Sequence, residues 1–275
     1  MTGRGSAVRI RYIPLIIIKL IPLKITFLGT GTSQGIPVIA CNCEVCQSSN
    51  LKDKRLRSSI MIEIDENIFI IDTGMDFRQQ MLRENVKSIN AILVTHSHKD
   101  HIGGLDEIRS FNFILKKAID VYANKSTAKC IKNEYNYVFA EIKYPGVPLI
   151  NLHEIENEPF FINSIKFTPI EALHYKMTVF GYRINDFTYI TDANFISEKE
   201  LDKIRGSKVL VISALRRTEH VSHFTLQQAI DIIKEINPAQ AYLTHISHQL
   251  GTYDTVSAEL PQNIFMAYDG LELKI

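Results

Sequence analysis

Three imidazoles and one carboxylate fall within the six positions of residues 96–101, whose candidate ligands are His96, His98, Asp100 and His101. This run directly follows the apolar residues 92–94. Loops that leave a buried strand are where functional residues concentrate. Imidazole and carboxylate are also preferred ligands of divalent ions such as zinc, manganese or iron. The spacing therefore predicts a metal site rather than a solvated turn.

The pattern His-x-His-x-Asp-His resembles the signature of the metallo-β-lactamase superfamily, with Gly103 and Gly104 following it. The resemblance implies an α/β fold, an αββα four-layer sandwich with two mixed β-sheets. It also implies a hydrolase that uses two adjacent divalent metal ions.

Further ligand types stand where apolar segments end: His174 after a predicted strand 165–171, Asp192 after 186–191, and His245 after 239–244. Each alone is equally compatible with a turn residue. The resemblance implies that His96, His98 and His174 hold one ion, that Asp100, His101 and His245 hold the other, and that Asp192 bridges them. Asp72 resembles a conserved acid that orients ligands, although a helix cap is an alternative.

The positive charge of two divalent cations exceeds the negative charge of the Asp100 and Asp192 carboxylates, so we expect the site to favour an anionic substrate. Paired ions activate a bridging water and neutralise the attacking and leaving oxygens of phosphate esters. We therefore expect hydrolysis of a small phosphodiester, cyclic or linear, through a metal-bridging hydroxide. Asp100 and His223 are the predicted catalytic residues: His223 would protonate the leaving oxygen or stabilise the phosphorane, and His220 is its competitor.

A second cluster has the form Cys-x-Cys-x-x-Cys, with Cys41, Cys43 and Cys46. Three thiolates require a fourth ligand to close a structural zinc site, and His248, three residues after His245, is the candidate. Clustered thiolates without a signal peptide indicate a reducing, cytoplasmic location. We expect about three metal ions per chain, two of manganese or zinc in the active site and one structural zinc.

A narrower resemblance covers residues 24–275. The segment 26–37, the cysteine cluster and the segment 243–249 together resemble the phosphoribosyl 1,2-cyclic phosphate phosphodiesterase family of the carbon-phosphorus lyase pathway. That family implies two manganese-like catalytic ions, a separate structural zinc and a catalytic histidine at His223. It does not imply the particular substrate.

The chain has 275 residues, 45% hydrophobic and 22% charged, with a formal net charge of +1. This composition is typical of a globular enzyme and argues against a broad basic surface for nucleic acid. Residues 1–22 are expected to form a poorly ordered extension, with one hydrolase domain over 23–275. The apolar run near the N-terminus is short and interrupted by Lys19, so we expect no membrane anchor.

Apolar and β-branched segments predict many strands alternating with helices. Turns at 65–67 and 185–186 predict antiparallel hairpins, and Ser197 with Glu200 predicts a capping box. The predicted strands are 24–28, 58–65, 67–72, 89–95, 119–123, 165–171, 178–184, 186–191, 208–213, 239–244, 263–268 and 271–275, and the predicted helices are 75–85, 102–117, 125–140, 197–205 and 224–236.

Two other functions fit parts of the pattern. One is a tRNA 3′-processing nuclease, for which the sequence offers no long basic arm. The other is a non-hydrolytic protein resembling the B protein of pyrroloquinoline quinone biosynthesis, in which the histidine motif is eroded; here the motif is intact. A metal-bound scaffold that only binds a partner remains open. The expected partner is a small phosphodiester with no stable nucleic-acid complex, and a homodimer is left open.

Overall fold

The computed structural model describes residues 22–275. The predicted extension over 1–22 therefore lies, apart from its last residue, outside the described residues. Strand β1 begins at Leu23, and the domain boundary placed there stays a prediction. No helix among the described residues has the length and apolar character needed to cross a bilayer.

The strands form two mixed sheets. One has seven strands in the order β15-β1-β2-β3-β4-β5-β6, and the other has eight, in the order β11-β8-β9-β10-β12-β13-β14 with β7 paired to β8. The strands are β1 (Leu23–Gly29), β2 (Ser59–Ile64), β3 (Asn67–Ile71), β4 (Ala91–Leu93), β5 (Ile119–Asn124), β6 (Ile150–Ile155), β7 (Phe160–Ile162), β8 (Ile165–His174), β9 (Met177–Ile184), β10 (Phe187–Ile190), β11 (Phe195–Ile196), β12 (Val209–Ser213), β13 (Gln240–Thr244), β14 (Ile264–Met266) and β15 (Glu272–Lys274).

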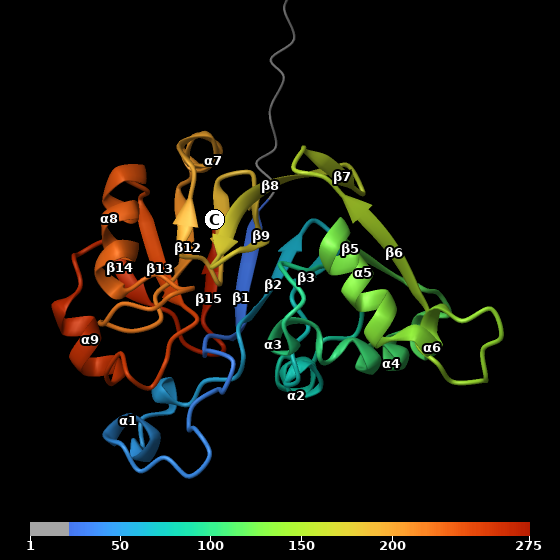
Figure 1. Cartoon of the computed structure of the whole chain (residues 1–275), viewed down its shortest axis with the longest axis horizontal. Coiled ribbons are helices and arrows are strands. Elements are labelled where there is room, and N and C mark those ends of the chain that lie inside the picture. The colour runs from blue at the N-terminus through green and yellow to red at the C-terminus, as the bar shows by residue number, and fades with distance from the viewer. Residues whose placement is uncertain (1–21) are drawn as a thin grey trace, which may run out of the picture.

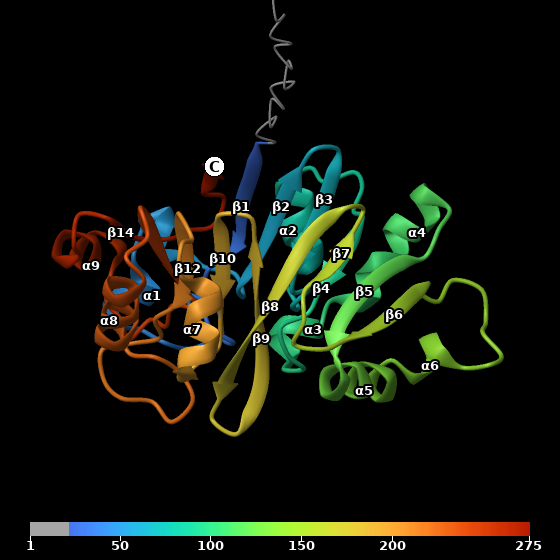
Figure 2. The same cartoon turned by 90° about the horizontal axis from the view of Figure 1, so that it is seen from above.

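Helices cover the outer faces of both sheets (Figures 1 and 2). The helices are α1 (Glu44–Gln47), which lies apart from the sheets, α2 (Phe77–Arg83), α3 (Lys99–Ile102), α4 (Arg109–Leu115), α5 (Lys125–Glu134), α6 (Asn136–Phe139), α7 (Glu198–Ile204), α8 (Leu226–Ile236) and α9 (Tyr253–Glu259), with 3-10 turns at Leu51–Asp53 and Leu105–Ile108.

Three hydrophobic cores hold these layers together. The central core joins the inner faces of the two sheets, and it includes Phe69 and Phe167, whose rings meet edge to face with centroids 5.1 Å apart. The outer cores lie between the first sheet and α2, α4 and α5, and between the second sheet and α7, α8 and α9. Burial of apolar faces on both sides of each sheet drives this layering. The predicted α/β four-layer sandwich with two mixed sheets is confirmed.

Both predicted hairpins are confirmed: β2 pairs antiparallel with β3, and β9 with β10. Asp65 and Asn185 take the positive φ angles that these tight turns require. The predicted helix over 102–117 is wrong as one element, because the backbone turns at Gly103 and Gly104 between α3 and α4. The predicted helix over 125–140 likewise divides at Tyr135, whose hydroxyl is held by the carbonyl of Ile102.

The predicted capping box of Ser197 and Glu200 is wrong. Ser197 makes no side-chain cap, and the carboxylate of Glu200 instead accepts a hydrogen bond from the backbone of Glu171. A reciprocal box is present at α8, between Thr225 and Gln228. The sequence analysis also missed short elements with weak patterns, namely β6, β7, β11, α1 and α9.

The carboxyl ends of the parallel strands lie at one edge of the sandwich. In the first sheet β3, β4 and β5 run parallel, and in the second β10, β12 and β13 run parallel. Parallel strands place their carboxyl ends at the same edge, where loops carry binding residues. The loops that leave β4, β10 and β13 carry the predicted active-site ligands except His174, which ends β8.

Candidate active site

The loop after β4 places the first four predicted ligands by short backbone contacts. His98 is the last residue before α3, and Asp100 and His101 lie in its first turn. The backbone amide of Thr73 donates to the carbonyl of His101 across 2.7 Å. A Cβ on Gly74 would stand 2.0 Å from the carbonyl oxygen of Asp100, so only glycine permits this close approach.

One group of ligand atoms comes from His96, His98, His174 and Asp192, all within 4.8 Å of one another. His96 Nε2 lies 3.1 Å from His98 Nδ1 and 3.7 Å from Asp192 Oδ2. His174 ends β8, and its Nδ1 donates to the carbonyl of Ser222 across 2.8 Å. That bond leaves Nε2 of His174 as the nitrogen with a free lone pair.

A second group comes from Asp100, His101, Asp192 and His245, again within 4.8 Å and all buried. His101 Nε2 lies 3.1 Å from Asp100 Oδ2 and 3.4 Å from Asp192 Oδ1. His245 Nδ1 lies 2.8 Å from the same Asp192 oxygen. The two groups therefore share Asp192, whose two oxygens face different clusters.

The backbone at these positions is unusual. Asp72, Asp192 and His245 adopt positive φ angles of 66°, 51° and 54°. Such angles are uncommon for residues other than glycine and concentrate at functional sites. Asp192 is the second residue beyond β10 and His245 the first beyond β13, so the positive φ angles lie where the backbone turns toward the shared site.

Asp72 supports the loop from beneath. Its carboxylate accepts hydrogen bonds from the backbone amide of Thr95, from the hydroxyl of Thr95 and from Nδ1 of His101, at 2.7–2.8 Å. Burial raises the pKa of Asp72, and His101 acts in the opposite sense. These contacts place Asp72 behind the ligands and do not cap a helix.

The residues fit a pair of divalent cations. Nε2 of His101 and Nδ1 of His245 are buried polar atoms that make no hydrogen bond of acceptable geometry among the described residues, which is costly unless another partner satisfies them. Burial opposes charge on His101, but Asp100, Asp192 and Asp72 raise its pKa well above the usual value. The cluster thus concentrates negative charge around nitrogen atoms, and its imidazole and carboxylate donors suit zinc or manganese.

His223 lies against both clusters. Its ring centroid is 4.5 Å from that of His174 and 4.9 Å from that of His245. Burial, reinforced by His245, lowers the pKa of His223 to about 3, so the ring is neutral at neutral pH. The competing candidate, His220, is farther out, with its ring 5.0 Å from that of His223 and its Nδ1 near the backbone amide of Ser222.

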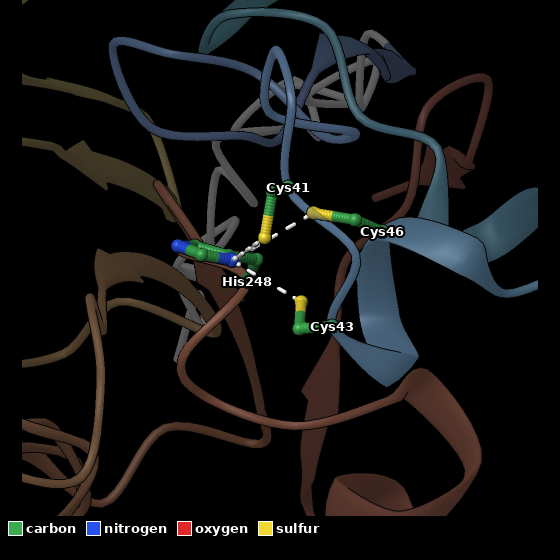
Figure 3. Close-up of side chains that lie close together, drawn as sticks. All are labelled: Cys41, Cys43, Cys46 and His248. Atoms are coloured by element: carbon green, nitrogen blue, oxygen red, sulfur yellow. Dashed lines mark hydrogen bonds between the residues drawn. The ribbon is translucent and has the colours of Figure 1, made fainter.

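The cysteine cluster is assembled as the sequence predicts (Figure 3). The sulfurs of Cys41, Cys43 and Cys46 lie 3.4, 3.3 and 3.7 Å from Nδ1 of His248. A tetrahedral zinc with ordinary bond lengths would separate such ligand atoms by about 3.6 Å. A hydrogen bond from the backbone of Cys46, with a second from His248, lowers the pKa of Cys43 to about 6, which favours its thiolate.

Two cavities flank the clusters. One, of about 490 Å³, is lined by His98 and His174 together with Tyr175, Met177 and Val221 on the β8–β9 turn and the opposite loop. The other, of about 230 Å³, reaches from His223 to His248. The histidines that line these cavities were predicted as site residues, whereas Arg216, Tyr175 and Val221 were not, because isolated residues carry no spacing signal.

Comparisons with known proteins agree with this geometry. The family model described as "Beta-lactamase superfamily domain" matches residues 67–246. A crystal structure of a "New Diphosphatase from the PhnP Family" superposes with a TM-score of 0.87 and 36% identity, over 92% of this chain and 97% of that one.

Curated sequences are similar over part of their length. An octanoyltransferase of Porphyromonas gingivalis is 37% identical over 253 residues, which is 91% of this chain and 51% of that protein. A ribonuclease Z of Methanococcus maripaludis is 32% identical over 140 residues, 50% of this chain and 38% of that protein. The chain thus spans about half of the first relative and less of the second. The matched family model, the fold and the near full-length diphosphatase match establish that the chain belongs to the metallo-β-lactamase superfamily, as a metal-dependent hydrolase related to the PhnP family.

Proposed function

We propose that this hydrolase is a phosphodiesterase that acts on a small phosphodiester at a dinuclear metal site. The observation that carries the proposal is that two ligand groups, buried apart from His98, share Asp192. His96, His98 and His174 would hold one ion, and Asp100, His101 and His245 the other. Manganese or zinc suits this donor set.

When bound, two adjacent divalent ions lower the pKa of water and neutralise charge on the attacking and leaving oxygens of a phosphate ester. The positive charge of two divalent cations exceeds the negative charge of the Asp100 and Asp192 carboxylates, so the completed site would attract an anion. The protein orients the ligands from behind through Asp72 and the Ser222 carbonyl. It also shields the chemistry, because most of the ligand side chains are buried.

His223 acts as a hydrogen-bond donor in this proposal. A neutral imidazole carries one N–H, and Nδ1 of His223 is buried without a hydrogen-bond partner among the described residues. A phosphoryl or leaving oxygen placed at the clusters would supply that partner. The low pKa of about 3 favours donation of a hydrogen bond over full proton transfer from an imidazolium.

Cys41, Cys43, Cys46 and His248 would bind a structural zinc. His245 and His248 belong to one short loop, so this zinc would fix the same backbone that presents an active-site ligand. Three clustered thiols are compatible with a reducing compartment such as the cytoplasm.

The test is metal analysis of the purified chain combined with a panel of esters. The proposal predicts hydrolysis of bis(p-nitrophenyl) phosphate and of at least one small cyclic or linear phosphodiester. Because octanoyltransferase is the name of a protein about twice as long, p-nitrophenyl octanoate belongs in the panel. Turnover of that ester without turnover of any phosphodiester would contradict the proposal.

A tRNA 3′-processing nuclease is the second candidate, because the chain is similar to ribonuclease Z over 140 residues. Precursor tRNA distinguishes the two functions. Specific cleavage at its 3′ end, with little activity on small diesters, would favour the nuclease.

A further inference from the structure

The cysteine cluster contains a Cys-x-x-Cys pair, Cys43 and Cys46, with the spacing that redox-active dithiols use. Cys43 directly precedes α1 and is half-buried, whereas Cys46 lies within α1 and is 4% exposed. Their sulfurs lie within 4.8 Å of each other, and both face Nδ1 of His248 (Figure 3). Sulfurs this close, in residues only three positions apart, can be joined with little movement of the backbone.

The two sulfurs differ in their access to solvent. Sγ of Cys46 accepts a hydrogen bond from the backbone amide of Val38 across 3.3 Å and packs in a small apolar cluster with Ile36 and Val45. Cys43 only borders this cluster and is partly exposed. Oxidant-sensing pairs combine an accessible thiolate, which reacts first, with a neighbouring thiol that resolves the product. We therefore expect Cys43 to meet an oxidant and Cys46 to be the resolving residue.

Cys41 is the third thiol of the cluster and is also half-buried. It lies two positions before Cys43, and a disulfide between these two residues would close a smaller and more strained ring than the Cys-x-x-Cys pair. A closed structural zinc site uses four ligands, and thiolates rather than disulfide sulfurs bind the metal. Oxidation of Cys43 and Cys46 would therefore leave only Cys41 and His248, which are too few to hold the zinc.

The zinc position links the cysteine segment to the active site. His248 follows His245 by three residues, and its partners in the cluster all lie in the segment 41–46. That segment has its own small apolar cluster, separate from the three main cores, and α1 lies apart from the sheets (Figure 1). The loop after β13 has a further backbone tie, since the amide of Ile246 donates to the carbonyl of Thr30 across 2.9 Å. Loss of the zinc should therefore release α1 and His248 while β13 stays in place.

We propose that Cys43 and Cys46 are a modification site, at which a peroxide forms a reversible disulfide that expels the zinc. The inference rests on the zinc site proposed above and adds a reaction of its ligands. The sulfur of Cys43 attacks one oxygen of hydrogen peroxide, the O–O bond breaks, and a sulfenic acid and one hydroxide ion result. The sulfur of Cys46 then attacks the sulfenic sulfur, so that the S–S bond forms, the S–O bond breaks and a second hydroxide ion leaves. Two thiolates thus lose two electrons to one peroxide, and a two-electron reductant reverses the change.

Titration of the intact chain with hydrogen peroxide tests the proposal. The active site is first loaded with manganese, so that zinc released to a chromogenic chelator comes from the cysteine cluster. We expect about one zinc ion to leave per chain as two thiols become unreactive toward N-ethylmaleimide, with a fall in the thermal midpoint. Tris(2-carboxyethyl)phosphine with added zinc should restore the thiols, the zinc content and the midpoint. Zinc release without loss of thiols, or a loss that the phosphine does not reverse, would overturn the proposal.

Peptide mapping identifies the bridge. Glu44 lies between the two cysteines, so cleavage after glutamate separates Cys43 from Cys46 unless a disulfide joins them. Mass spectrometry of the oxidised, maleimide-labelled chain should show the two peptides linked, with the label on Cys41. A label on Cys43 or on Cys46 would mean that Cys41 forms the bridge and would overturn the assignment.

Matched variants separate the pair from the zinc. Cys130→Ser removes a thiol outside the cluster and should leave zinc release and disulfide formation unchanged. Cys41→Ser removes a zinc ligand but retains the pair, so it should form the same disulfide although it binds zinc more weakly. Failure of Cys41→Ser to form that disulfide would overturn the proposed pair.

None of these measurements requires turnover. A chain that hydrolyses no phosphodiester but releases zinc as expected would refute the proposed enzyme activity and support this inference. A purified chain that holds no zinc at the cluster, yet forms the disulfide, would refute the structural zinc and overturn its expulsion.

Discussion

Nδ1 of His101 donates a hydrogen bond to Oδ2 of Asp72 across 2.7 Å, and both side chains are fully buried. The bond fixes the imidazole tautomer, so that Nε2 of His101, the nitrogen proposed as a ligand, faces Asp100 and Asp192. Thr95 donates to the same carboxylate from the start of the histidine loop. One buried acid therefore positions the loop and orients a proposed ligand.

Asp72→Asn should weaken metal binding at the His101 cluster by about 10–100-fold, because Asp72 accepts hydrogen bonds on both oxygens, whereas an uncharged amide has one acceptor oxygen and would turn its NH2 group toward the remaining donor. Competition with a chelator measures this affinity. Asp120→Asn is a matched control, since Asp120 pairs with His153 at 2.9 Å on the surface. Equal affinities in the intact protein and Asp72→Asn would refute the orienting role.

His98→Ala should abolish turnover and reduce the content of active-site metal while the cysteine-bound zinc remains. His98 supplies a ligand atom to the first group and none to the cysteine cluster. Elemental analysis before and after dialysis measures both populations, with His153→Ala as the control. Loss of all metals together with unfolding would show that the two sites are not separate.

Cys43→Ser should remove one zinc per chain and lower the thermal midpoint, because a thiolate beside His248 is lost. The two active-site ions should remain bound. Calorimetry and zinc analysis test this expectation, and Cys130→Ser is the control, as Cys130 lies on α5 outside the cluster. An unchanged zinc content would exclude Cys43 as a ligand.

His223→Gln should lower kcat by about 10²-fold or more while the metal content stays unchanged, as expected for a residue that touches the reacting phosphate. His220→Gln should have the smaller effect. Kinetics on bis(p-nitrophenyl) phosphate with parallel metal analysis distinguish the two histidines. A larger decrease in kcat in His220→Gln than in His223→Gln would show that His220, and not His223, contacts the reacting phosphate.

Asp269 makes the stability depend on pH. Burial raises its pKa to about 6, with opposing hydrogen bonds from Leu56 and Thr30. Since the folded pKa exceeds the unfolded value, its stabilising contribution is complete below about pH 4 and is lost as the pH rises through about 6.

Asp269→Asn removes this titration. The free energy of unfolding of the variant, relative to the native chain, should therefore increase between pH 4 and pH 7, by at most about 3 kcal/mol. Urea unfolding across that range measures the difference. A difference that is constant with pH would contradict the assignment.

The histidines and aspartates that the structure brings together around Asp192 could be predicted from the sequence, because they stand where apolar strands end and because the His-x-His-x-Asp-His spacing is specific. The sandwich was predicted from the family resemblance that this motif carries, whereas the strand patterns and the turns at Asp65 and Asn185 are local signals that predicted the mixed α/β character and the hairpins. The capping box predicted at Ser197 is absent because the carboxylate of Glu200 accepts a hydrogen bond from the backbone amide of Glu171, a contact that is distant in the sequence. The place of Arg216 at the smaller cavity could not be predicted, because it depends on contacts with Gln249 and Glu219 that no local pattern records.

Anomalous diffraction from crystals of the manganese-loaded chain tests the central claim most directly. The account predicts two manganese peaks about 3.5–4 Å apart with the Asp192 carboxylate between them. A single peak, or peaks bound away from His96, His101 and His245, would contradict a dinuclear centre.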